Sequence, residues 1–106
     1  MYYKPSEAEK ELFKAILKLE TIDEARKFLR DLLTEAELKE FANRWKVAQM
    51  LEEKIAYKKI EKETGMSSTT IARIQKWLTS GMGGYKLMLK KLANVNHHAT
   101  PRRLAV

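Results

Sequence analysis

Three helix-start signals follow one another in the first third of the sequence, and they constrain the fold more than any other feature. In each signal, a serine or threonine precedes a glutamate by three residues, which is the pattern of a capping box. The pairs are Ser6 with Glu9, Thr21 with Glu24, and Thr34 with Glu37. Apolar residues recur at helical spacing after each pair. The pattern therefore predicts three helices that begin directly after residues 6, 21 and 34.

Three shorter helices are predicted in the rest of the chain, at about residues 56–64, from residue 67 or 68 to 78, and at about 85–93. Gly65 suits the left-handed conformation that ends a helix, and three glycines within residues 81–84 interrupt the helical pattern. No segment alternates as a strand would. The predicted fold is all-α with six helices, in one domain over residues 1–93. Residues 94–106 are predicted to form a basic, flexible tail.

Several classes of function are disfavoured by composition. Cysteine is absent, which excludes disulfides, thiolate metal sites and a cysteine nucleophile. The two histidines, His97 and His98, are neighbours whose side chains point apart in an extended segment, so no metal site is expected. No carboxylates cluster with a base, and no phosphate-binding loop occurs, so the chain is not expected to be an enzyme. No apolar run approaches the length of a membrane span, and no signal peptide is seen, which indicates a cytoplasmic protein.

Charge is divided unevenly along the chain. Residues 1–53 carry 10 lysines and arginines against 12 acidic residues, whereas residues 54–106 carry 11 against 2, for a net charge of +7 overall. Such asymmetry is typical of a chain whose basic half faces a polyanion, although a solvated basic surface would give the same count.

The basic half contains the spacing of a helix-turn-helix at about residues 56–78. Two short helices meet at Gly65, and Ile60, Ile71 and Ile74 are predicted to form the core that fixes their crossing. The second helix starts with small hydroxylated residues, which fit the major groove and reach bases and phosphates. The candidate DNA-binding residues are Tyr57, Lys58, Lys62, Ser67, Ser68, Thr69, Thr70, Arg73 and Lys76.

Other interpretations of these residues remain open. The two helices could be an ordinary helical hairpin of a bundle. Tyr57 could touch a phosphate or simply pack at the start of its helix. Arg73 could contact DNA, an effector or an acidic side chain. Trp45 and Trp77 fit a core or a dimer interface.

Several motifs resemble the Trp repressor superfamily. They are Leu33–Glu37 (LTEAE) through Arg44, and Gly65 through Ile71–Arg73 (IAR); the runs Phe41–Leu51 (FANRWKVAQML), Thr69–Arg73 (TTIAR) and Gly84–Leu89 (GYKLML) are closer still to its YerC/YecD-like branch. The resemblance covers about residues 20–92. It implies an intertwined homodimer, whose core is built by the first three helices and the last one. It also implies sequence-specific transcription regulation, usually repression, through two recognition helices in successive major grooves.

The resemblance also suggests an effector site. In Trp repressor the corepressor lies between two arginines and near a threonine, and these positions resemble Arg44, Arg73 and Thr34. Two guanidinium groups can clamp a carboxylate, although Arg44 could equally form a salt bridge with a nearby glutamate. The residue after the second arginine is glycine in Trp repressor and Ile74 here. No cofactor is therefore expected to be required, and Ile74 argues against L-tryptophan as the effector.

Two functions follow from the sequence. The first is a homodimeric, DNA-binding transcription regulator that acts on double-stranded DNA. The alternative is a helical dimeric protein-interaction module without specific DNA binding, which would not retain DNA at physiological salt.

Overall fold

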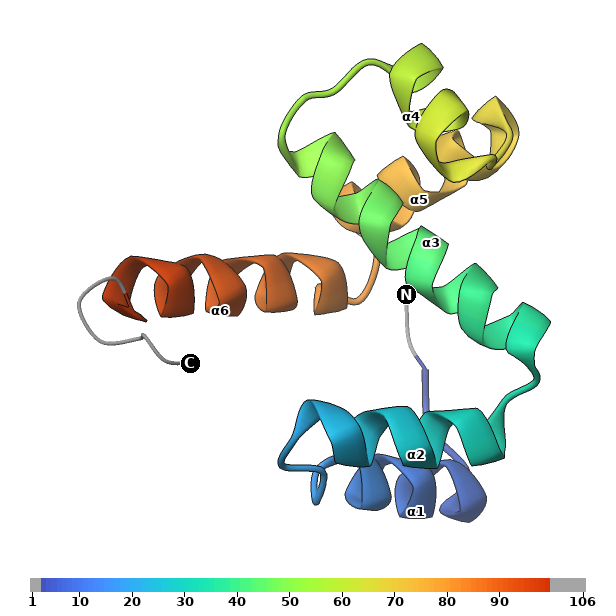
Figure 1. Cartoon of the computed structure of the whole chain (residues 1–106), viewed down its shortest axis with the longest axis vertical. Helices are drawn as coiled ribbons and strands as arrows, with labels where there is room; N and C mark the ends of the chain where they lie inside the picture. The colour runs from blue at the N-terminus through green and yellow to red at the C-terminus, as the bar shows by residue number, and fades with distance from the viewer. Residues whose placement is uncertain (1–2, 100–106) are drawn as a thin grey trace. The chain divides into compact units, whose positions relative to one another are not determined.

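The computed structural model describes the backbone of residues 3–99 and the side chains of residues 3–94, all of it helices and their connections (Figure 1). The described residues contain no strand, which confirms the predicted all-α fold with six helices. The helices are α1 (Glu7–Ile16), α2 (Ile22–Leu32), α3 (Glu35–Glu52), α4 (Tyr57–Thr64), α5 (Ser68–Ser80) and α6 (Gly84–Ala99).

The helix starts follow the predicted caps, with one difference. At α1 the Ser6 hydroxyl accepts from the Glu9 amide at 3.1 Å, and the Ser6 amide donates to Glu9 Oε1 at 2.8 Å. Thr34 and Glu37 make the same reciprocal pair at α3. At α2 the Thr21 hydroxyl accepts from the Glu24 amide at 3.0 Å.

The predicted capping box at α2 is only half formed. The Glu24 carboxylate accepts from the amide of Glu20 at 2.9 Å, one residue before the position that a capping box requires. The carboxylate still satisfies a backbone donor beside the helix start, so α2 begins where the sequence predicted.

Contacts group the chain into two compact units, residues 1–42 and 43–106, and α3 contributes to both. In the first unit, α1 and α2 contain no buried residue. Charged side chains of this unit pair within a helix, as Arg26 and Lys27 do with Asp23, and between helices, as Arg30 of α2 does with Glu35 of α3 at 3.6 Å. The apolar side chains of Leu12, Phe28 and Leu29 are only half-buried, and others such as that of Ile22 are exposed.

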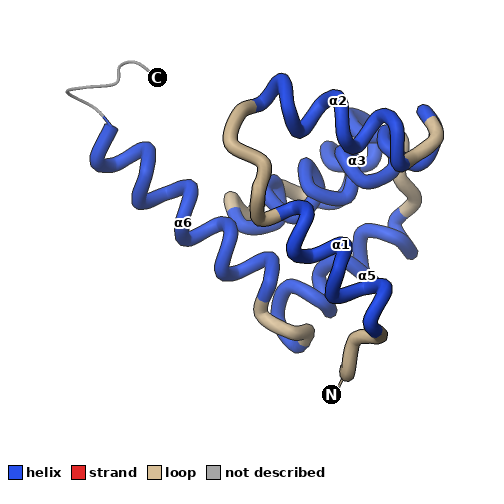
Figure 2. The backbone as a smooth tube through the Cα atoms, turned by 90° about the horizontal axis from the view of Figure 1, so that it is seen from below, coloured by secondary structure: helices blue, strands red, loops and turns tan. Residues whose placement is uncertain are grey.

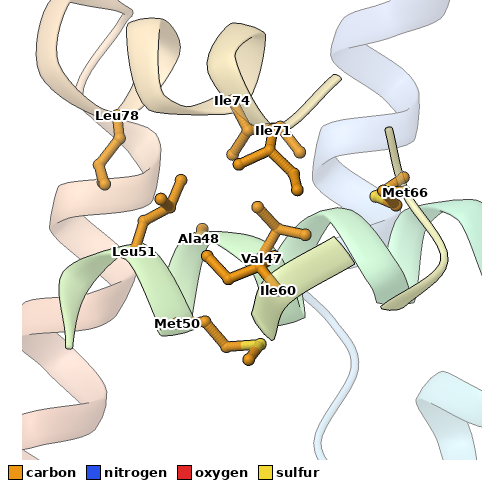
Figure 3. Close-up of a cluster of buried hydrophobic side chains, with 9 residues drawn as sticks. All are labelled: Val47, Ala48, Met50, Leu51, Ile60, Met66, Ile71, Ile74 and Leu78. Carbon is orange, nitrogen blue, oxygen red and sulfur yellow. The ribbon is translucent and has the colours of Figure 1, made fainter. Parts of the chain in front are cut away.

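The second unit is built around an apolar core that joins α3, α4 and α5 (Figure 3). From α4 and α5 come Ile60, Ile71, Ile74 and Leu78, and from α3 and the turn between α4 and α5 come Val47, Ala48, Met50, Leu51 and Met66. Tyr85 and Leu89 of α6 pack against this cluster. The predicted core of Ile60, Ile71 and Ile74 is confirmed, with exposed fractions of 0%, 0% and 4%.

Glycine ends both helices of the predicted helix-turn-helix, for different reasons. Gly65 has a φ of 75°, the left-handed conformation that side chains disfavour. Gly81 has an extended backbone, but a Cβ at this position would lie 2.5 Å from the carbonyl oxygen of Trp77. The end of α4 therefore needs the conformational freedom of glycine at residue 65, and the end of α5 needs its small size at residue 81.

The last helix is longer than predicted. The sequence predicted a helix at about residues 85–93, but α6 continues to Ala99 (Figure 2). Residues 94–99 contain neither glycine nor proline, and the first residue that cannot continue a helix is Pro101, so polarity was a poor guide to its end. The part of the predicted tail from residue 100 onward, with Arg102 and Arg103, lies outside the described residues, as do the side chains of His97 and His98.

Candidate nucleic-acid interface

The start of α5 presents small hydroxylated side chains whose roles differ. Ser67 is the N-cap: its hydroxyl accepts from the Thr70 amide at 3.2 Å and donates to Thr70 Oγ1 at 3.1 Å. Ser68 and Thr69 are exposed, and no side-chain hydrogen bond holds them within the described residues. Ser67 and Thr70 thus shape the helix start, while Ser68 and Thr69 are available to a ligand.

The apolar core holds this helix start in place. Ile71 lies one residue after Thr70 and is fully buried, and Ile60 of α4 is fully buried with it. The turn between the helices is fastened by the Thr64 hydroxyl, which donates to the Ile60 carbonyl at 2.7 Å and accepts from the Met66 amide at 3.2 Å. Buried apolar groups fix the angle at which α4 and α5 cross. The exposed residues of the two helices are therefore held in a fixed arrangement.

Four cations of α4 and α5 are exposed and not neutralised by an acidic neighbour. Lys58 and Lys62 on α4, and Arg73 and Lys76 on α5, are exposed and form no ion pair with any described residue. Only Lys59 approaches a carboxylate there, that of Glu63 at 3.9 Å. Because these charges are not neutralised within the unit, they are available to an anionic partner.

Tyr57 opens α4 and lies at the wall of a groove of about 390 Å³ that Gln75 and Thr79 of α5 also line. It is 37% exposed, and the N-cap before it, Ala56, provides no side-chain acceptor for the first amides of the helix. The structure thus brings Tyr57 beside the second half of α5, a neighbourhood compatible with either of its predicted roles.

The three candidate effector residues occupy different settings. Thr34 belongs to the first unit, where its hydroxyl accepts from the Glu37 amide and so caps α3. Arg44 on α3 and Arg73 on α5 belong to the second unit, and both side chains are exposed. Ile74, next to Arg73, points into the core with Ile71 (Figure 3).

An open apolar cavity of about 510 Å³ separates the two tryptophans of the chain, both of which line it together with Met82, Tyr85 and Met88. The rings of Trp45 and Tyr85 stack at a centroid distance of 6.2 Å. Trp77 is 38% exposed. Sequence reasoning identified the tryptophans but not their partner Tyr85, because the pairing joins residues 40 positions apart across α3 and α6.

Lys54 and Lys86 are candidate interface residues that sequence reasoning missed. Both line the same groove as Tyr57, but Lys54 follows α3 and Lys86 lies in α6, outside the helix-turn-helix pattern. No local signal marks them, since the folded chain alone brings four helices together around this groove.

Neither a metal-binding cluster of three or more potential ligands nor a helix long and apolar enough to cross a membrane occurs in the described part of the chain.

Comparisons with known proteins agree with this geometry. The family model described as Trp repressor protein matches residues 7–93. The chain is 40% identical over 82 residues to the uncharacterized protein YerC of Bacillus subtilis strain 168, which covers 77% of this chain and 79% of that protein.

Two crystal structures are similar throughout most of their length. One is a TrpR-like protein from Eubacterium eligens, with a TM-score of 0.80 and 38% identity over 83% of this chain and 91% of that one. The other is a proposed Trp repressor from Staphylococcus aureus, with a TM-score of 0.79 and 36% identity over 84% and 89% of the two chains.

Proposed function

Because this chain belongs to the Trp repressor protein family, a family of transcription regulators and not of enzymes, we propose that it is a sequence-specific DNA-binding repressor. The observation that carries the proposal is the combination, in α4 and α5, of exposed cations without an ion pair and the exposed hydroxyl side chains of Ser68 and Thr69. Family membership supports DNA-binding regulation in general, and the residues of this chain suggest how the binding is divided.

Phosphate contacts supply most of the affinity in this proposal. Lys58 and Lys62 on α4 and Lys76 on α5 neutralise phosphates and release condensed counterions. Arg73 contacts a phosphate from the same helix. These contacts position the protein on the duplex without distinguishing its sequence.

Base discrimination belongs to the start of α5. The major groove is about 12 Å wide and admits a helix, and small side chains let the backbone of that helix approach the bases. Ser68 and Thr69 have exposed hydroxyls for base edges, whereas those of Ser67 and Thr70 bond to each other. Ser68 and Thr69 are therefore stronger candidates for sequence discrimination than Ser67 and Thr70.

The proposed repressor is a homodimer. A segment of about 40 residues rarely buries enough apolar surface to be stable alone. The first unit, residues 1–42, has no buried residue in α1 or α2 and exposes Phe13, Ile16, Leu17 and Ile22. A second copy of the chain would cover such faces, and two helix-turn-helix units would then address half-sites about 34 Å apart.

DNA binding in this proposal requires no L-tryptophan. The position next to Arg73 is glycine in Trp repressor, but here it holds Ile74, whose side chain is 4% exposed in the core. We therefore expect less room for an indole beside Arg73 than a glycine at this position would leave. Titration of the protein with L-tryptophan in a calorimeter should give no saturable heat, and clear saturable binding would contradict this part of the proposal.

Selection of bound sequences from a random duplex pool tests the function. We expect enrichment of a two-fold symmetric site, and loss of affinity by about 10³–10⁵ between about 50 and 200 mM salt if 6–10 phosphates are contacted. A chain that retains no duplex at physiological salt, or enriches no sequence, would instead support the protein-interaction module.

The Thr69→Ala variant then tests whether Thr69 contacts bases or only helps to position the protein on the duplex. We expect it to weaken binding of the homodimer to the selected site by roughly 25-fold, equivalent to one net hydrogen bond of about 1 kcal/mol in each of the two half-sites, and to leave binding to random duplex unchanged. Equal losses on both duplexes would show that Thr69 does not read sequence. The exposed Lys18→Gln in the first unit is the matched control, since its charge lies outside the helix-turn-helix.

A further inference from the structure

The groove beside Tyr57 has the composition of a site for a sugar–phosphate chain. Its apolar part comes from Leu51, Ile55 and Leu78, while Tyr57, Gln75 and Thr79 contribute polar groups. Leu51 and Leu78 also belong to the core, so this part of the groove is rigid. A nucleic-acid strand presents the same alternation, with an apolar deoxyribose face between charged phosphates.

The charges at the groove favour an anion. Lys54 and Lys86 line it, and neither forms an ion pair with any described residue. One carboxylate, that of Glu52, lies there as well and opposes them. The net charge of the lining side chains is therefore positive. The two cations flank the helix-turn-helix in the sequence, Lys54 before it and Lys86 after it.

The backbone at Lys54 supports a role for its side chain. Lys54 has a φ of 64°, and it is the one non-glycine residue among residues 3–99 with a positive φ. Its amide donates to the Leu51 carbonyl at 3.0 Å, and the next amide donates to the Met50 carbonyl, which ends α3 in a motif where glycine or asparagine is usual. A lysine in this conformation costs about 1 kcal/mol relative to glycine, so the backbone alone would favour glycine here.

The groove also lies where a phosphate strand would pass. Ser68 and Thr79 are separated by 11 residues of α5, which corresponds to about 16 Å along the helix axis. The major groove is only about 8.5 Å deep. When the start of α5 touches base edges, its second half therefore lies near the groove edge, where the backbone runs.

We propose that this groove seats the sugar–phosphate backbone of one DNA strand next to the bases read by α5, with Lys54 and Lys86 as phosphate-binding residues. The inference rests on the proposed function and extends the DNA contact beyond the helix-turn-helix to the end of α3 and the start of α6. It also assigns an opposing role to Glu52, which repels the same strand.

The test measures binding of a random-sequence duplex by fluorescence anisotropy as a function of salt. For Lys86→Gln we expect the slope of log affinity against log salt to decrease in magnitude by about 2, because the proposed homodimer loses one phosphate contact in each protomer, so that affinity falls roughly tenfold less between about 50 and 200 mM. Glu52→Gln should bind more tightly at low salt. Lys18→Gln, as the matched control, should leave both quantities unchanged.

The Lys54→Asn variant distinguishes the effect of the lysine charge on DNA binding from the effect of the residue on folding. Asparagine accepts the left-handed backbone more easily than lysine, so the melting temperature should stay constant or rise while the salt slope decreases as for Lys86→Gln. If the affinity for DNA instead changes only together with the melting temperature, Lys54 is a structural residue and its assignment as a phosphate-binding residue is wrong.

The outcomes distinguish this inference from the function on which it rests. If the wild-type chain binds duplex but Lys86→Gln and Lys54→Asn behave as Lys18→Gln does, the groove assignment alone is wrong. If the wild type binds no duplex, both proposals fail. An NMR titration without DNA compares inorganic phosphate with chloride at equal ionic strength. Saturation of the groove by millimolar phosphate would assign the groove to a small anion and overturn the proposal that it binds a DNA strand.

Discussion

Single residues decide whether the helix-turn-helix keeps its shape, and Ile74 is the clearest case. It lies on α5 between the exposed Arg73 and the half-buried Gln75, yet its side chain is 4% exposed and packs with Ile71 in the core. The same side chain occupies the position that the family resemblance associates with a ligand. Its volume therefore serves stability where a glycine would leave space.

Shortening Ile74 should weaken the fold in proportion to the atoms removed. Ile74→Val is expected to lower the free energy of unfolding by about 0.5–1.5 kcal/mol, and Ile74→Ala by about 2–5 kcal/mol, because the core cannot close the cavity completely. Urea denaturation followed by circular dichroism measures both values. Equal stabilities for the two variants would mean that residue 74 is not a packed core position.

Gly81 is a second such residue, and it matters because it has no side chain. A Cβ there would meet the backbone carbonyl of Trp77 at 2.5 Å, whereas one at Gly84 would meet nothing within 4 Å. We expect Gly81→Ala to lower the melting temperature, by a destabilisation within the common range of about 0.5–3 kcal/mol. Gly84→Ala, the matched control, should leave stability unchanged or improve it by up to about 1 kcal/mol, since residue 84 begins α6. Equal losses in the two variants would contradict the steric explanation.

Among the elements, α1 depends most directly on its cap. The Ser6 amide donates to the Glu9 carboxylate, and this hydrogen bond, together with one from Tyr3, lowers the pKa of Glu9 below its ordinary value. A carboxylate whose pKa is lower in the folded state stabilises the fold above its unfolded pKa and loses that contribution as pH falls through the folded pKa. The cap of α1 is thus expected to weaken in acid.

Acid titration tests this expectation. Below about pH 4.3, the ordinary pKa of a glutamate, the amides of α1 should lose protection progressively in NMR spectra. Glu9→Gln keeps an acceptor for the Ser6 amide but does not titrate, so the start of its α1 should be less sensitive to pH over the same range. Identical acid sensitivity in both proteins would mean that other groups control this helix.

Features that depend on residues close together in the sequence could be predicted, whereas features that depend on distant residues could not. Caps act within three residues, so Ser6, Thr21 and Thr34 correctly predicted three helix starts. Ile60, Ile71 and Ile74 were identified as core because the spacing around Gly65 limits how two short helices can meet. The end of α6 was missed because polarity does not stop a helix. The groove around Lys54 and Lys86 was missed because its walls come from segments separated in sequence.

In the whole molecule, apolar surface is distributed unevenly. The second unit has a core of nine buried residues, whereas α1 and α2 in the first unit bury none. Ile22, at the start of α2, is 89% exposed, and it is one of several large apolar side chains, with Phe13, Ile16 and Leu17, that this unit leaves exposed. The stability of the chain is therefore expected to depend on association.

That dependence can be measured directly. For the wild type, the melting temperature should rise with protein concentration, and sedimentation should show a dimer. Ile22→Glu should yield a less stable monomer whose melting temperature does not vary with concentration. Lys18→Glu introduces the same side chain on a polar surface and should remain dimeric. A wild-type monomer with concentration-independent melting would contradict the homodimer.

The cavity between Trp45 and Trp77 gives the chain an intrinsic optical signal. The Trp45 indole is half-buried and stacks on Tyr85, whereas the Trp77 indole is open to water, so the two should fluoresce at different wavelengths. A quencher such as acrylamide should reach Trp77 first. Whatever molecule comes to cover this cavity would shift the emission to the blue, and would thereby report its arrival without any attached dye.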